Sequence, residues 1–144
     1  MNIKETLFQL SNAVGIGNIT DASTKAYQTL SKYARTTQDG INVVGKINGI
    51  SNYTLMLEAH IDEVGFVVTD IDNCGFLTVK NCGGIDPRAL PARTVTIHGK
   101  EKITGVFCAT PPHLGGPKEY DDISALKIDT LLGEKAKDVI SVGD

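Results

Sequence analysis

The sequence contains few cysteines, and their spacing argues against two kinds of small, stapled protein. The three cysteines are Cys74, Cys82 and Cys108, and no two of them form a C-x-x-C pair. An odd number without that spacing argues against a disulfide framework and against a structural zinc knuckle. We interpret all three as reduced thiols packed in or near strands, which fits a cytoplasmic location.

Long apolar runs and basic clusters are missing as well. No run of about 18 apolar residues exists, so we expect no transmembrane helix. The first five residues include Lys4 and Glu5 and lack the apolar region of a signal peptide. The 14 basic and 17 acidic residues give a formal net charge of −3, with no Lys/Arg cluster. We therefore expect neither a membrane nor a nucleic acid as a partner.

The remaining composition is that of a soluble globular protein, with 41% hydrophobic and 22% charged residues among 144. Most of the 15 glycines lie after residue 40, which points to tight turns and short strands. Apolar periodicity predicts a helix over residues 3–14, with Asn2 and Glu5 at capping-box spacing, and a second helix starting after Thr20 or Asp21. We predict strands over the following ranges: 41–47, 53–59, 64–71, 76–80, 94–98, 103–108 and part of 123–132. A short helix is expected within 133–139.

The organisation changes near residue 65. Two helices and two or three strands precede it, as at the start of an α/β layer structure. Closely spaced short strands follow it, as in a small β-barrel or a sandwich. The fold class is therefore mixed α/β. Within this frame, residues 55–57 (Leu-Met-Leu) are apolar on both faces, which is typical of a strand buried in a sheet.

That strand delivers the most distinctive local pattern, a histidine followed two residues later by an aspartate. His60 is expected at or near the carboxyl end of the strand, where α/β sheets place their sites. Imidazole is the commonest side-chain metal ligand, and Asp62 could orient it if the chain stays extended. The alternative is a strand-end histidine held by hydrogen bonds to its neighbours.

Other candidate groups favour structural roles. His98 precedes a Gly-Lys turn, and His113 lies in a loop fixed by two prolines. Asp70 and Asp72 belong to a turn region. The adjacent pair Asp121–Asp122 is interpreted as solvated rather than as the acid and base of a glycosidase. The Gly15-x-Gly17 pair follows a helix rather than a strand and so fails as a phosphate loop, and no Gly-x-Ser-x-Gly elbow is present.

The run Leu-Met-Leu-Glu-Ala-His-Ile-Asp-Glu-Val-Gly-Phe over residues 55–66 resembles the first metal-ligand motif of a known family. It is the family of glutamyl and deblocking aminopeptidases, which are co-catalytic metallo-aminopeptidases. Some members carry the name cellulase M or endoglucanase. Shorter pieces continue the resemblance in the family's order: 72–77, 83–87, 95–99, 105–106, 111–114 and 142–144.

The resemblance implies an N-terminal part of an α/β/α metallopeptidase layer over residues 1–67, followed by an incomplete, inserted β-barrel-like domain over 68–144. It makes His60 a ligand of one of two divalent metal ions, zinc or cobalt, and Asp62 the supporting catalytic carboxylate. The implied substrates are peptides with a free N-terminus. The implied β-domain function is assembly into large homo-oligomers.

The same resemblance predicts that residues 1–144 alone are inactive. In the family the remaining metal ligands and the glutamate base lie downstream of the β-domain, beyond Asp144. A non-catalytic β-domain that assembles or binds a ligand is the alternative function. Glycoside hydrolysis is a weaker alternative, because nothing in the spacing supports two carboxylates flanking a sugar cleft.

Overall fold

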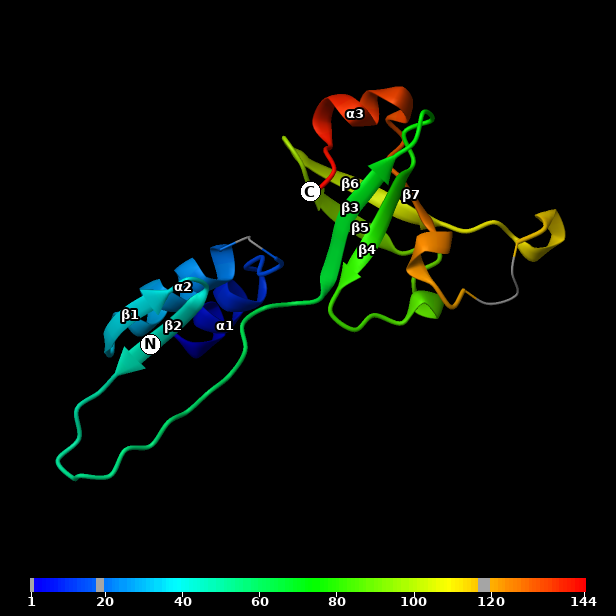
Figure 1. The fold of residues 1–144 in the computed structure, drawn as a ribbon. Helices are drawn as coiled ribbons and strands as arrows, with labels where there is room; N and C mark the ends of the chain where they lie inside the picture. The colour runs from blue at the N-terminus through cyan, green and yellow to red at the C-terminus, as the bar shows by residue number, and fades with distance from the viewer. Residues whose placement is uncertain (1, 18–19, 117–119) are drawn as a thin grey trace. The chain divides into compact units, whose positions relative to one another are not determined.

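A computed structural model of the chain describes residues 2–17, 20–116 and 120–144. It divides into two compact units, Met1–Glu63 and Val64–Asp144, which are described separately here (Figure 1). The boundary expected from the sequence, after residue 67, lies within the first strand of the second unit. Together the units form the mixed α/β class expected, with helices confined largely to the first unit and a curled sheet in the second.

The first unit begins with two helices, α1 (Ile3–Ser11) and α2 (Asp21–Leu30). The side chain of Asn2 accepts a hydrogen bond from the backbone N–H of Glu5 at 3.3 Å, so the predicted cap is present. Helix α1 ends three residues before the predicted end. Its last turn is closed by Asn12, whose side-chain amide donates to the carbonyl of Phe8 at 2.9 Å.

A hairpin follows, made of β1 (Arg35–Asp39) and β2 (Asn42–Lys46). Its turn contains Gly40 with a φ of 58°, a conformation that favours glycine. Strand β2 confirms the strand predicted over 41–47. The partner β1 was not expected, because its sequence Arg-Thr-Thr-Gln-Asp has no apolar alternation to mark it.

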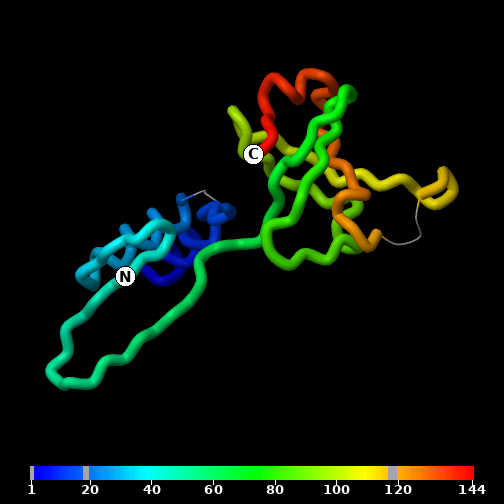
Figure 2. The backbone as a smooth tube through the Cα atoms, in the orientation of Figure 1, coloured from blue at the N-terminus to red at the C-terminus, as the bar shows by residue number. Residues whose placement is uncertain are grey.

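The buried strand predicted over residues 53–59 is wrong for this structure. The described residues 52–64 form neither a helix nor a strand, and Figure 2 shows them as a long loop after β2. Leu55, Met56 and Leu57 are 74%, 77% and 88% exposed. A strand that is apolar on both faces needs sheet neighbours and covering layers, and the described part of the first unit supplies none for this segment.

The second unit is one antiparallel sheet of five strands in the order β3-β4-β7-β6-β5. Each predicted strand of this half is confirmed, although the strand expected in 123–132 is only three residues long. The strands are β3 (Gly65–Ile71), β4 (Leu77–Cys82), β5 (Thr94–His98), β6 (Lys102–Cys108) and β7 (Lys127–Asp129). The predicted helix in 133–139 is confirmed as a 3-10 turn followed by α3 (Ala136–Val139).

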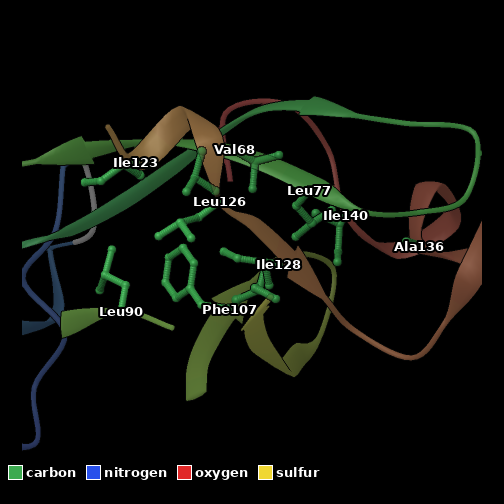
Figure 3. Close-up of a cluster of buried hydrophobic side chains, with 11 residues drawn as sticks. Val68, Leu77, Leu90, Phe107, Ile123, Leu126, Ile128, Ala136 and Ile140 are labelled. Atoms are coloured by element: carbon green, nitrogen blue, oxygen red, sulfur yellow. The ribbon is translucent and has the colours of Figure 1, made fainter. Parts of the chain in front are cut away.

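The core of this unit lies on one face of the sheet, and Figure 3 shows its side chains. Phe107 of β6 is 1% exposed, and its backbone pairs with Ile128 of β7. The ring of Phe107 meets the ring of Phe66 edge to face, with centroids 5.0 Å apart. The other buried members of the cluster come from β3, β4, the 3-10 turn before β5, β5 itself and the segment after residue 122: Val68, Leu77, Val79, Leu90, Ile97, Ile123, Leu126, Ala136 and Ile140.

Strand β3 is irregular near its middle, and the last residues of the unit form hydrogen bonds with it at this point. Its register with β4 shifts between Val68 and Asp70. The backbone N–H of Val68 donates to the carbonyl of Asp144 at 2.8 Å, and the N–H of Gly143 donates to the carbonyl of Val68 at 2.9 Å. The last residues therefore pair with β3.

Among the described residues, no helix has the length and apolar character to cross a bilayer.

The turn between β3 and β4 tests how closely it packs against the segment that contains Gly133. A side chain at Gly75 would place its Cβ 1.9 Å from the carbonyl oxygen of Gly133, at a φ of 84°. We expect Gly75→Ala to destabilise the second unit by more than the roughly 1–2 kcal/mol that a left-handed backbone costs alone. The matched control is Gly84→Ala, since a Cβ there would meet nothing within 4 Å. Urea unfolding of both variants measures the difference, and equal stabilities would contradict the structure.

Candidate functional site

The histidine and aspartate singled out from the sequence lie together at the end of the first unit. The Nδ1 atom of His60 is 3.2 Å from Oδ1 of Asp62 and 3.1 Å from the backbone oxygen of Asp62. Both side chains are open to solvent, with 87% of His60 and 70% of Asp62 exposed. Their contact places the two side chains on the same side of the chain.

These contacts favour one tautomer of the neutral imidazole ring. A carbonyl oxygen can only accept, so the short contact with the Asp62 carbonyl is favourable only when Nδ1 of His60 carries the proton. In the neutral ring the other nitrogen, Nε2, then has a free lone pair. Metal-binding histidines commonly donate one ring N–H to a carboxylate or carbonyl and bind the ion through the other nitrogen. His60 and Asp62 show this arrangement of donor and acceptor.

The chain next to this pair is tied to the loop that follows α1. The N–H of Glu63 donates to the carbonyl of Gly15 at 2.9 Å, and the N–H of Gly15 donates to Oε1 of Glu63 at 3.2 Å. Sequence reasoning did not identify either residue as part of the site. They are 48 positions apart, and Gly15 was assigned only to the end of a helix.

The other histidines have the structural positions that the sequence favours. His98 is the last residue of β5 and pairs with Lys102 across the turn into β6. His113 lies exposed in a 3-10 turn at Pro112–Leu114. Asp72 accepts hydrogen bonds from the N–H groups of Cys74 and Phe76 at 2.9 and 3.0 Å, so its carboxylate holds a turn.

Asp122 is not suited to act as a general acid. Its carboxylate accepts a hydrogen bond from the backbone N–H of Ser124 at 2.9 Å, and this bond holds the pKa of Asp122 below its ordinary value. A glycosidase acid needs a raised pKa instead. The geometry therefore gives no support to the glycosidase alternative at the Asp121–Asp122 pair.

The residues present fit one position of a metal centre and not a complete centre. His60 offers one nitrogen, with Asp62 behind it. Across residues 2–17, 20–116 and 120–144, no three His, Cys, Asp or Glu side chains gather closely enough to hold an ion. A site with two metals about 3.5–4 Å apart needs several more ligands. No catalytic step through a metal can be derived from these residues alone.

The sequence model of the M42 glutamyl aminopeptidase family matches residues 41–144, which is more than half of the chain. The lysyl aminopeptidase of Pyrococcus furiosus is 34% identical over 90 residues, covering 57% of this chain and 26% of that protein.

Two solved structures resemble the whole described chain. A TET aminopeptidase from a marine-sediment archaeon of the Thaumarchaeota superposes with a TM-score of 0.88 at 25% identity, covering 98% of this chain and 43% of that one. The TET1 peptidase of Pyrococcus horikoshii, which can assemble into a tetrahedron or a large octahedral shell, gives 0.79 at 27% identity, covering 98% and 44%. The chain thus spans less than half the length of each of these relatives.

Proposed function

Because this chain belongs to the M42 glutamyl aminopeptidase family, we propose that it is the N-terminal part of a metal-dependent aminopeptidase that removes N-terminal residues from peptides. Residues 1–67 would contribute to the catalytic domain, and residues 68–144 would form most of an inserted β-domain. The family is a family of hydrolases, and the fold of both units resembles TET aminopeptidases. The observation that carries the proposal is the contact of Nδ1 of His60 with the carboxylate and the carbonyl oxygen of Asp62.

Within this proposal His60 binds one of two divalent ions, zinc or cobalt, through Nε2. Asp62 fixes the imidazole through Nδ1 and is the catalytic carboxylate of this segment. A metal ion in such a centre would supply an activated water for attack on the peptide bond. What the chain itself contributes is the orientation of one nitrogen ligand, held by the contacts at 3.1 and 3.2 Å.

The exposed apolar residues of the first unit support the view that other parts of an enzyme cover them. Ile3, Leu7 and Phe8 of α1 are 70%, 64% and 57% exposed. Leu55–Leu57 are exposed to a similar or greater degree, in a segment that has no strand partner among the described residues. Apolar surface of this extent is a mark of an interface rather than of a finished surface.

We predict that residues 1–144 alone show no aminopeptidase turnover and hold little metal. The test is metal analysis of the purified chain after mild loading with zinc or cobalt, with His60→Ala as the control. We expect much less than one ion per chain, because one histidine and one carboxylate make a weak site. Nearly one ion per chain that depends on His60, or turnover of an aminoacyl substrate, would show that local groups complete the site.

We further propose a homo-oligomer, supported by the ability of the P. horikoshii relative to assemble into a tetrahedron or a large octahedral shell. A cytoplasmic location is supported by the three free cysteines. Size-exclusion chromatography with light scattering tests the first point. A monomer at both low and high concentration would contradict assembly through this chain, and would also remove the alternative of a non-catalytic assembly module.

A further inference from the structure

The loop after α1 lies between α2 and the His60–Asp62 segment. On one side, the N–H of Ala22 in the first turn of α2 donates to the carbonyl of Val14 at 3.1 Å. On the other side, Gly15 exchanges two hydrogen bonds with Glu63, one through the backbone and one through the side chain. The loop therefore connects a helix to the residue that directly follows Asp62.

The contact at Gly15 leaves no room for a side chain. A Cβ on Gly15 would lie 2.9 Å from the carbonyl oxygen of Ile61, 3.0 Å from Cβ of Ala22 and 3.4 Å from Cα of Asp62. Gly15 is itself buried. Backbone thus packs directly on backbone between His60 and Asp62, which only glycine permits at this distance.

We propose that Gly15 and Glu63 are positioning residues that hold the His60–Asp62 pair in its orientation, by clamping the backbone on which both side chains stand. The proposal rests on the proposed role of His60. Because His60 and Asp62 are largely exposed, their own contact gains little and would be lost often on a free loop. The carboxylate of Glu63 accepts a hydrogen bond from the N–H of Gly15, while Ala22 of α2 lies against Gly15 and donates to the carbonyl of the preceding Val14.

The test variants change the hydrogen bond between the N–H of Gly15 and the side chain of Glu63. Glu63→Ala removes the acceptor of the Gly15 N–H, whereas Glu63→Gln keeps an Oε1 atom that can accept the same bond. Glu58→Ala is the matched control, because Glu58 precedes His60 by two residues and is exposed. Gly15→Ala tests the same contact from the other side.

The measurements are made on the metal-free 144-residue chain. Amide hydrogen exchange at Gly15 should accelerate about tenfold in Glu63→Ala, the size expected for one lost hydrogen bond. The ¹⁵N shifts of the His60 ring, in mildly alkaline buffer in which imidazole is neutral, should show Nδ1 protonated in the wild type. That preference should fall in Glu63→Ala and Gly15→Ala, and stay in Glu63→Gln and Glu58→Ala.

The outcomes separate this proposal from the function on which it rests. A wild-type preference for Nδ1–H that survives Glu63→Ala unchanged, with unchanged exchange at Gly15, would overturn the positioning role alone. A wild-type ring without that preference would overturn the orientation of His60 and the positioning role together. If Gly15→Ala fails to fold, the contrast between Glu63→Ala and Glu63→Gln still decides, because a purely global loss of stability would not alter the ring tautomer in the folded protein.

Discussion

Replacing His60 by alanine in the complete aminopeptidase of which this chain is a proposed part is expected to abolish turnover and to lower the bound metal. The Nε2 atom of His60 is the proposed ligand nitrogen, and the contacts of Nδ1 with Asp62 orient the ring that carries it. Without it, a metal ion at that position would have one nitrogen ligand fewer and would bind less tightly, and a lost ion would supply no activated water. Metal content by mass spectrometry and kcat/KM on aminoacyl substrates are measured together.

Asp62→Asn should have a smaller effect than His60→Ala. A carboxylate behind a metal-binding histidine contributes about 10–100-fold in metal affinity or activity. The control is His113→Ala, because His113 lies exposed in a turn of the second unit. Full activity of His60→Ala at unchanged metal content would refute the ligand assignment. A loss in His113→Ala as large as in His60→Ala would show that the assay reports folding instead.

Phe107→Ala is expected to unfold most of the second unit under mild denaturant. Phe107 is 1% exposed and lies beside Leu126 and Ile128 in the core (Figure 3). Truncating a fully buried phenylalanine costs about 3–5 kcal/mol, which is a large share of the roughly 5–15 kcal/mol that stabilises a typical domain. The edge-to-face contact with Phe66 is lost as well.

The control for this core prediction is Leu114→Ala, since Leu114 is 70% exposed. Urea titration followed by circular dichroism compares the unfolding midpoints of the two variants with the wild type. Leu114→Ala should unfold with the wild type. If Phe107→Ala had the same unfolding midpoint as the wild type, Phe107 would not be part of a core between β6 and β7, and the structure would be contradicted.

The local elements of the fold were predictable wherever a short sequence decides the geometry. Asn2 caps α1, and Asp72 and Gly75 close the turn between β3 and β4, because a side-chain acceptor and a glycine act within a few residues. The prediction over residues 53–59 failed for the opposite reason. A segment that is apolar on both faces forms a buried strand only where neighbouring strands and covering layers surround it. The described residues form no such surroundings for this segment.

The candidate site shows the same division between near and distant contacts. His60 and Asp62 are two residues apart, so a contact between their side chains could be expected from the spacing, although no strand forms at these residues. The bonds between Gly15 and Glu63 join positions far apart in the chain, and no periodicity links them. A glycine with no room for a Cβ becomes visible only once the backbone that crowds it is in place.

The pairing of the last residues with β3 has a consequence for the construction of the protein. Val68 exchanges backbone hydrogen bonds with Gly143 and Asp144, so the first strand of the second unit and residues 143–144 run side by side. Paired strands lie about 4.8 Å apart. A domain whose first strand and last residues are that close can be inserted into a surface loop of another domain without moving the two ends of that loop apart.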